Sequence, residues 1–567
     1  MDAMRFRRAR SFVVPAACVA CALAAAAAAP YLVDAPVVWH EDDRRDVPQP
    51  TPRDPNVIAT AVDETFFRGL GRLLNPVRLL RVFGTTLGGQ PAPPAANPNR
   101  LDEVPSSSWF TNRIGLFPLS PAEAAAGPIP GGEPDTTALL IVTSAKTQGV
   151  TPGFNVRDHR GSRFVIKFDP PGYPAMTTAA GVITGRILYA AGYNTPHDAI
   201  IRLRRDQLAV GEGVRFTAED GEERLMTDAD LDAILDRVER SPDGSWRALA
   251  SRYLSGVPIG PFDWRGRRRD DPNDRVSHED RRELRGFRMF AAWLCHYDTK
   301  QGNTLDMFVE QDGRGFVRHY FIDFASTLGA GALGPVPTAC HEYSVDIGLT
   351  LGRTLALGLW QDPWRRIERP AGLEEIGFFQ SKIFHPMAFR PIEPNAAYAN
   401  FTDRDGYWAA KIISAFSDDH LRALVAEGRY GDPAAAQWIV RVLGERREAI
   451  ARYFFDRIPP LDFFIADGSM LRFRDLGVER GVYPVNPARY RYRVGYAAAD
   501  GRIEWRGRWT ETVETTFELW SETGASAESP AAEFVTAEVQ VHRGVRWSPG
   551  VRVFVATASG RVVRVDR

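Results

Sequence analysis

No part of this sequence limits the possible folds more than the succession of patterns between residues 136 and 214. The apolar runs TALLIVTSA, GFNVRD and RFVIKFD are separated by the turn-forming stretches KTQGVTPG and HRGS, which predicts antiparallel strands. A helix is expected from about Thr177, as its N-cap, to Ala191, because apolar side chains recur at helical spacing and Gly192 follows as a C-cap. The run DAIIRLRRDQLAV then predicts further strand. Strands, a helix and strands in this order predict an α+β fold.

A second helix is expected to lead directly into the segment HYDTKQGN at residues 296–303. Ser277 and Asp280 have capping-box spacing, and apolar residues recur at helical spacing from Leu284 to Leu294. The runs TLDMFVE and RHYFIDF, joined by the turn QDGRG, predict a hairpin. Helical segments are expected to follow as far as about Phe464, including residues 409–416 and 434–456.

After about Pro484 the pattern changes to alternating strands such as RYRYRVGY and AEFVTAEVQVHR. Their spacing predicts a separate small all-β sandwich. Trp505, Trp509 and Trp520 are interpreted as core residues of this sandwich, with a sugar-binding platform as the alternative. A division into several domains agrees with the length of 567 residues, since a single hydrophobic core stops growing at about 250–300 residues.

The start of the chain has the pattern of a targeting segment. Four arginines lie between Met1 and Ser11, and an apolar run extends from Phe12 to Val33 with A-x-A sequences near its end. A signal peptide and export to the periplasm are therefore expected. The alternative is an uncleaved single-pass membrane anchor that leaves the chain facing outward, because the apolar run is about 20 residues long.

Charge and cysteine content exclude some classes of site. The formal net charge is -1, so no overall field recruits nucleic acid, and no nucleic-acid partner is expected. Cys295 and Cys340 are expected to be reduced core cysteines, with a single disulfide as the alternative in an oxidising compartment. No cysteine or histidine spacing is typical of a zinc site.

Three short motifs contain the candidate catalytic and ligand-binding residues. His296-Tyr297-Asp298-Thr299-Lys300-Gln301-Gly302-Asn303 resembles the protein-kinase catalytic loop H-R-D-x-x-x-x-N, in which the aspartate accepts a hydroxyl proton and the asparagine binds metal. Ile322-Asp323-Phe324-Ala325 resembles the metal-binding D-F-G element. Lys167 in FVIKFD is similar to the phosphate-binding lysine of V-A-I-K strands. Upstream, Gly149 and Gly153 match the glycine-rich phosphate loop in part.

The resemblance is to atypical protein kinases, of the HipA-like, lipid-kinase-like and secretory-pathway types. It implies a two-lobed kinase-like fold that uses ATP and Mg. It also implies catalytic roles for Asp298 and Lys300, nucleotide contacts from Lys167, Gly149 and Gly153, and metal binding by Asn303 and Asp323. The acceptor would be a hydroxyl group on a protein, lipid or glycan.

The resemblance also predicts how the chain is divided into domains. The segments DEVPSSSWFTNRIG and RRRDDPNDRVSHEDRRELRG are similar to parts of uncharacterised bacterial envelope proteins. The expected order is a signal peptide or anchor (1–33), a Pro-rich linker and N-terminal arm (34–100), a kinase-like small lobe (101–214), an insertion and kinase-like large lobe (215–480), and a β-sandwich (481–567).

One part of the kinase pattern is missing. Kinases pair the strand lysine with a glutamate of the following helix, but the predicted helix from Thr177 to Ala191 contains no acidic residue, and Gly181 stands where the glutamate is expected. Glu103 and Asp169 are candidate replacements. The alternative function is therefore a catalytically inactive kinase-fold binding or scaffold protein of the cell envelope.

Overall fold

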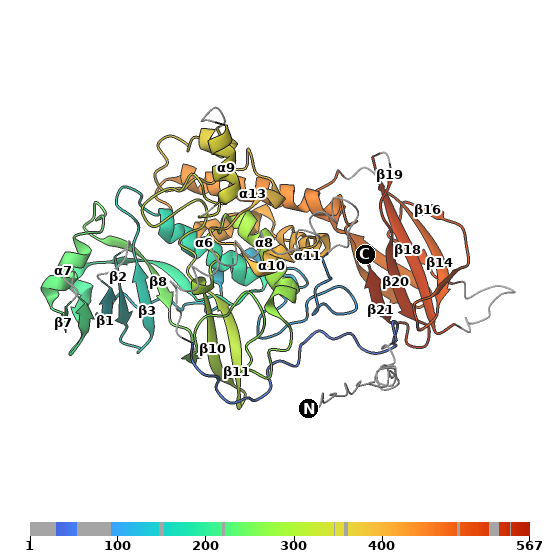
Figure 1. Cartoon of the computed structure of the whole chain (residues 1–567), viewed down its shortest axis with the longest axis horizontal. Helices are drawn as coiled ribbons and strands as arrows, with labels where there is room; N and C mark the ends of the chain where they lie inside the picture. The colour runs from blue at the N-terminus through green and yellow to red at the C-terminus, as the bar shows by residue number, and fades with distance from the viewer. Residues whose placement is uncertain are drawn as a thin grey trace, which may run out of the picture.

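The computed structural model describes residues 30–53, 92–146, 152–217, 222–344, 346–356, 361–484, 488–520, 532–544 and 546–567. A mixed sheet lies at one end, helices lie in the middle, and a second β region lies at the other end (Figure 1). Most of the predicted targeting segment and Gly149 fall outside these residues. Within the described ranges, no helix is long and apolar enough to cross a membrane.

The mixed sheet has the strand order β4-β8-β3-β2-β1-β5. β1 runs parallel to β5, and the other neighbouring pairs are antiparallel. One face packs against the short helix α7 in a core that includes Phe154, Ile166 and Leu231. The strands expected from the apolar runs are confirmed. Their bounds, with that of α7, are β1 Leu140–Lys146, β2 Gly153–Arg157, β3 Arg163–Lys167, β4 Asp198–Leu203, β5 Leu208–Val210, β8 Trp246–Arg252 and α7 Asp228–Leu235.

The predicted helix is present as α6 (Met176–Ala191), which covers the other face of this sheet and packs Val182 against Ile200 and Leu249. Its start differs from the expectation. The N-cap is Ala175 rather than Thr177, and the carboxylate of Asp169 accepts hydrogen bonds from the backbone N–H groups of Thr177 and Thr178, both at 2.9 Å. A side chain from outside the helix thus satisfies its free donors, which the local sequence did not indicate.

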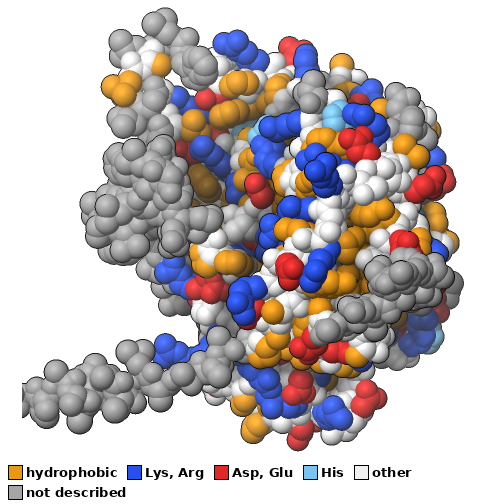
Figure 2. Space-filling view, turned by 90° about the vertical axis from the view of Figure 1, so that its right-hand side faces the viewer, with side chains coloured by type: hydrophobic (Ala, Val, Ile, Leu, Met, Phe, Trp, Pro, Cys, Tyr) orange, Lys and Arg blue, Asp and Glu red, His pale blue; other side chains and the backbone are white. Residues whose placement is uncertain are grey.

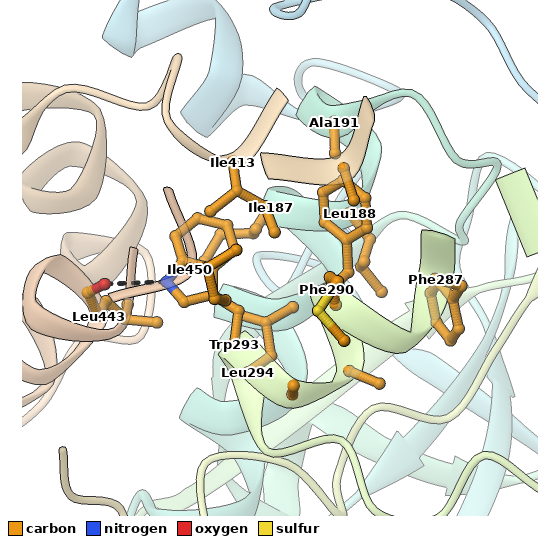
Figure 3. Close-up of a cluster of buried hydrophobic side chains, with 14 of the residues drawn as sticks. Ile187, Leu188, Ala191, Phe287, Phe290, Trp293, Leu294, Ile413, Leu443 and Ile450 are labelled. Carbon is orange, nitrogen blue, oxygen red and sulfur yellow. Dashed lines mark hydrogen bonds between the residues drawn. The ribbon is translucent and has the colours of Figure 1, made fainter. Parts of the chain in front are cut away.

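The helices of the middle region enclose a large core. Trp293 of α8 donates a hydrogen bond from Nε1 to the Leu443 carbonyl of α13 at 2.8 Å, and Ile187 of α6 and Ile413 of α11 pack around this pair (Figure 3). The helices expected at residues 409–416 and 434–456 are confirmed. The bounds are α8 Arg282–Leu294, α10 Ala396–Ala399, α11 Asp403–Ile413, α12 Asp418–Ala426 and α13 Pro433–Phe455.

The capping box predicted at Ser277 and Asp280 is wrong. A 3-10 turn, η3 (His278–Asp280), comes first, and α8 starts after an extended Arg281 that makes no side-chain cap. Asp280 instead accepts a hydrogen bond from Arg285 Nη2 at 2.6 Å. The carboxylate that was expected to cap the helix therefore compensates a buried arginine in its first turn.

The predicted hairpin that follows the 296–303 segment is confirmed. β10 (Thr304–Gln311) pairs with β11 (Arg314–Phe321), and β10 also pairs with β9 (Val257–Pro258). Asp312 and Gly313 form the turn with φ values of 52° and 72°, the left-handed conformation that suits two-residue hairpin loops. β11 ends directly before Ile322 and Asp323, so the hairpin positions the second motif beside the first.

The second β region consists of two sheets packed face to face. One has the order β15-β14-β18-β20-β21, with β16 beside β14 and β19 beside β18, and the other has the order β12-β13-β17. Leu471 and Phe517 of the smaller sheet share a core with Val539 and Val553 of the larger one. Residues 461–464 belong to a strand, so the helical segments end earlier than expected. The bounds are β12 Leu461–Asp467, β13 Met470–Asp475, β14 Arg489–Ala497, β15 Ile503–Trp505, β16 Thr510–Thr512, β17 Thr516–Glu518, β18 Phe534–Arg543, β19 Arg546–Trp547, β20 Val551–Ala556 and β21 Val562–Asp566.

Two of the tryptophans expected in the sandwich core lie elsewhere. Arg493 stacks over Trp505 at 3.9 Å, and Arg491 stacks over Trp509 at 4.5 Å. All four side chains are half-buried, so the tryptophans serve as cation–π partners. Trp520, in contrast, packs against the core. At this end of the molecule, basic side chains are interspersed with apolar ones (Figure 2).

Short elements complete the described chain. They are α5 Pro121–Ala126, η2 Arg205–Gln207, β6 Arg215–Thr217, β7 Glu223–Leu225, η4 Gln301–Asn303, α9 Ile347–Leu355, η5 Pro363–Arg366, η6 Pro386–Ala388 and α14 Leu476–Glu479.

Candidate functional site

A cavity of about 390 Å³ lies between the mixed sheet, the start of α6 and the segments that follow α8 and β11. Lys167, Asp298 and Asp323 line it, together with Gly153. Three distant parts of the sequence that resemble one kinase site therefore meet at one cavity. The remaining lining residues are Ser144, Pro152, Phe154, Asn155, Val165, Ile166, Phe168, Thr177, Thr178, Leu249, Ala325, Ser326 and Ala332.

Lys167 is the last residue of β3 and forms an ion pair with Asp323. Its Nζ lies 2.9 Å from Asp323 Oδ1, and the two side chains are 33% and 45% exposed. Burial favours the neutral acid, but the charge and hydrogen bond of Lys167 outweigh it and hold the pKa of Asp323 below its usual value. Asp323 is therefore ionised and able to bind a cation.

The backbone of Asp323 has φ of 59°. Residues other than glycine seldom adopt this left-handed conformation, which costs free energy. The backbone of the following Phe324 to Thr327 is held from one side, since Thr327 Oγ1 bonds to the Phe324 carbonyl at 2.8 Å and to the Ala180 carbonyl of α6 at 3.2 Å. The segment that directly follows Asp323 is thus anchored to α6.

The 296–303 segment is also fixed by its neighbours. It begins after Cys295, which closes α8 in a left-handed conformation. The His296 ring is buried against Phe324, with 5.8 Å between ring centroids, and burial lowers the pKa of His296 to about 4. Tyr297 donates its hydroxyl to the Ala330 carbonyl at 2.9 Å. The loop that carries Asp298 therefore packs directly on the segment that carries Asp323.

Asp298 presents one oxygen without a partner. Its Oδ2 lies 3.0 Å from Lys300 Nζ, whereas Oδ1 is buried and has no hydrogen-bond partner among the described residues. A buried carboxylate oxygen left unpaired is costly. Asp298 lines the cavity, but this particular oxygen is shielded from solvent.

Asn303 lies behind the cavity lining. Its Nδ2 donates to the Asp298 carbonyl at 2.7 Å, and its own carbonyl accepts from the Ile322 N–H at 3.0 Å. Through its side chain and its main-chain carbonyl together, Asn303 joins the loop of Asp298 to the strand end before Asp323. Lys300 reaches the site through its ion pair with Asp298.

Gly153 has a structural reason to be glycine. It pairs with Lys167 across β2 and β3, and an added Cβ would lie 2.7 Å from the Ile166 carbonyl oxygen. The close approach of β2 to β3 therefore requires glycine at this position.

The close packing of helix α6 explains why it has no glutamate at residue 181, where kinases would place one. Gly185 packs against the ring of Phe324, and an added Cβ at Gly181 would lie 2.7 Å from Leu249 Cδ1. Thr184 Oγ1 and Thr327 Oγ1 are 2.8 Å apart. Small residues bring the helix close to the segment after Asp323, and a long acidic side chain at residue 181 would not fit without rearrangement.

Neither candidate replacement for that glutamate contacts Lys167. Asp169 caps α6, and its Oδ2 lies 3.6 Å from Arg247 Nε. Glu103 forms a buried ion pair with Lys411. Both proposals are wrong in this structure, because each carboxylate compensates other donors.

The expectation of reduced cysteines is also wrong. Cys295 and Cys340 form a disulfide with a Cα–Cα distance of 5.7 Å. The bond joins the end of α8, directly before His296, to the segment that follows Thr327. Sequence spacing could not indicate it, because the two residues are 45 positions apart and meet only through the tertiary fold.

The oxygen donors around the cavity are few for a metal site built from protein ligands alone. Among the described residues, no group of three or more His, Cys, Asp and Glu side chains could hold one. Asp323 and Asn303 nevertheless supply oxygen ligands of the type that Mg²⁺ prefers, and Mg²⁺ commonly completes its shell with water and substrate phosphate. In chemical type, although not as a complete ligand set, these two side chains match the ligands of Mg²⁺.

Comparison with family models, curated proteins and solved structures finds no match to the chain.

Proposed function

We propose that the chain is an exported, kinase-like phosphotransferase that uses ATP and Mg²⁺ to phosphorylate a hydroxyl group. The proposal rests on one observation above all. Lys167, Asp298 and Asp323 line the same cavity and follow the chain order lysine, catalytic loop, metal aspartate. In this proposal the mixed sheet with α6 is the small lobe and the helices from α8 onward are the large lobe.

Each group has a role in the proposed reaction. The γ-phosphoryl group passes from ATP to the acceptor: a new P–O bond forms to the hydroxyl oxygen, and the bond to the β-phosphate oxygen breaks to release ADP. The Asp298 carboxylate accepts the hydroxyl proton, and Lys167 and Lys300 balance phosphate charge. Asn303 and Asp323 would be the protein ligands of Mg²⁺, which would neutralise negative charge on the phosphates.

The acceptor belongs to the compartment that the targeting segment indicates. A chain exported to the periplasm, or anchored facing outward, would meet proteins, lipids and glycans of the cell envelope. The net charge of -1 gives no support for a nucleic-acid acceptor.

A specific observation favours the second candidate, an inactive binding or scaffold protein. Lys167 is already paired with Asp323 at 2.9 Å, and α6 carries no acidic residue. An ion pair of this kind satisfies both charges in the absence of a bound nucleotide. The two candidates differ in whether Mg-ATP binds.

The deciding experiment is calorimetric titration of the full chain with Mg-ATP, together with measurement of ADP release. Wild type should bind and turn over. Asp323→Asn should weaken metal-dependent binding at least tenfold, and Asp298→Asn should retain binding while ADP release falls about 100-fold or more. Asp312→Asn is the matched control, because Asp312 also has a positive φ but lies at the exposed hairpin tip. If wild type binds no Mg-nucleotide, the scaffold function replaces this proposal.

A further inference from the structure

A buried carboxylate that the motifs do not include lies on the same face of the sheet as Lys167. Asp198 begins β4 and is 5% exposed. It pairs with Ser251 of β8, which in turn pairs with Val165 of β3. Paired residues of antiparallel strands share a face, as do residues two apart in one strand. Asp198 and Lys167 therefore both point to the face that α6 covers.

The strand geometry brings the two side chains near each other. Two strand spacings across and two residues along place their α-carbons about 12 Å apart. An extended lysine side chain can direct its ammonium group over much of that distance. The electrostatic influence of Lys167 on Asp198 agrees with this placement, because it favours the charged carboxylate.

The Asp198 carboxylate lies under the Asp323 segment. A Cβ added to Gly185 of α6 would lie 3.6 Å from Asp198 Oδ2 and 3.3 Å from Phe324 Cδ2. The small residues that bring α6 close to Phe324 thus leave room at the same place for an acid from β4.

Asp198 is also incompletely paired. Its Oδ1 has no hydrogen-bond partner, and the carboxylate makes no ion pair, among the residues that the structure describes. Arg186 is close, but its Nη2 donates to the main-chain carbonyl of Asp198 at 3.1 Å and its Nη1 to the Ala126 carbonyl. Burial raises the pKa of Asp198 to about 6, and the Ser251 side chain and the Lys167 charge oppose this rise.

Lys167 would lose its present partner in the proposed reaction. Asp323 cannot hold Lys167 Nζ at 2.9 Å and also give its oxygens to a metal without weakening one interaction. A half-buried ammonium that loses its anion needs another. Phosphate supplies one on the cavity side, and Asp198 is the available carboxylate on the sheet side.

We propose that Asp198 is a positioning residue that takes over Lys167 from Asp323 when a nucleoside triphosphate and its metal bind. The carboxylate that kinases place on the helix after the lysine strand is here supplied by β4. This inference rests on the proposed function, since it needs a nucleotide in the cavity.

The test is a double-mutant cycle on the full chain, with calorimetric affinity for Mg-AMP-PNP as the readout. Asp198→Asn should weaken binding about tenfold in the wild-type background. In the Lys167→Met background the same change should alter affinity by less than about twofold, because the group that Asp198 positions is gone. Asp271→Asn is the matched control, being an equally buried aspartate outside the cavity.

The outcomes separate the two proposals. If wild type binds but Asp198→Asn binds equally well, or weakens binding equally in both backgrounds, the role of Asp198 is overturned and the proposed function stands. If wild type does not bind, both are overturned. Should Asp198→Asn fail to fold, a crystal structure of wild type with Mg-AMP-PNP decides: Lys167 Nζ bonded to the Asp198 carboxylate supports the inference, and Nζ still bonded to Asp323 overturns it.

Discussion

Single residues in the cavity and beneath it are held in arrangements that cost stability. Asp298 keeps a buried oxygen unpaired, Asp323 has a left-handed backbone, and Asp198 is buried without an ion pair among the described residues. Unpaired buried acids and strained backbone are typical of sites that bind or react, because selection for stability alone would remove them.

The buried His296 predicts that the stability of the fold depends on pH. Burial lowers its pKa from about 6.5 to about 4, so the unfolded chain binds this proton more readily than the folded chain. The stability contribution is complete above pH 6.5 and is lost as the pH falls toward 4. From pH 8 to pH 5, this histidine alone should remove about 2 kcal/mol from the free energy of unfolding.

Urea unfolding at the two pH values measures this loss. His296→Gln should reduce the difference between pH 8 and pH 5 by about 2 kcal/mol. His159→Gln, at a half-exposed position, controls for the substitution itself. An acid loss that is identical in wild type and His296→Gln would contradict the assignment of His296 as a buried neutral ring.

At the scale of elements, the disulfide connects the end of α8 to the segment after Asp323. It closes a loop with a sequence separation of 45 residues that contains both candidate motifs of the large helical region. A cross-link of this size restricts the unfolded chain and typically contributes about 2–4 kcal/mol. Cys295→Ala with Cys340→Ala should therefore lower the free energy of unfolding by about that amount.

The measurement is urea unfolding with and without a phosphine reductant. Reduced wild type should match the double variant, and the double variant should not respond to reductant. Wild type that keeps its full stability while mass spectrometry shows free Cys295 and Cys340 would refute the prediction.

Local patterns were sufficient for most elements. The strands of the mixed sheet, α6, the hairpin and the strands after Pro484 follow from apolar periodicity and turn residues. Helix starts were predicted less well, because Asp169 and Arg285 act through contacts that spacing does not reveal. The pairing of Cys295 with Cys340 was missed for the same reason.

The candidate site shows the same limit. Lys167, Asp298, Asn303 and Asp323 could be named from short motifs, since each motif is continuous in sequence. Asp198 could not, because its relation to Lys167 depends on the register of β3, β8 and β4. The one sequence signal was negative: a helix without an acidic residue indicated that a carboxylate had to come from elsewhere.

For the whole molecule, a buried ionic cluster connects the sandwich to the helices. Arg567 is 1% exposed and lies 2.8 Å from Asp462 at the start of β12, and its guanidinium lies over the Tyr407 ring of α11. Lys411 of α11 contacts the same Asp462 at 3.1 Å and pairs with Glu103. Charges from four separated positions in the sequence thus compensate one another where the two regions meet.

This cluster predicts a strong dependence of stability on Arg567. Arg567→Met would leave Asp462 with fewer positive partners in a buried place, and removing one partner of a buried ion pair costs about 3–5 kcal/mol. Urea unfolding should show that loss, whereas Arg502→Met should leave stability unchanged within error, because Arg502 is 85% exposed in its ion pair with Asp500. Adding Asp462→Asn to Arg567→Met should restore part of the loss, because it removes the uncompensated charge. Equal stability of Arg567→Met and wild type would show that packing of the apolar surfaces alone holds the sandwich on the helices.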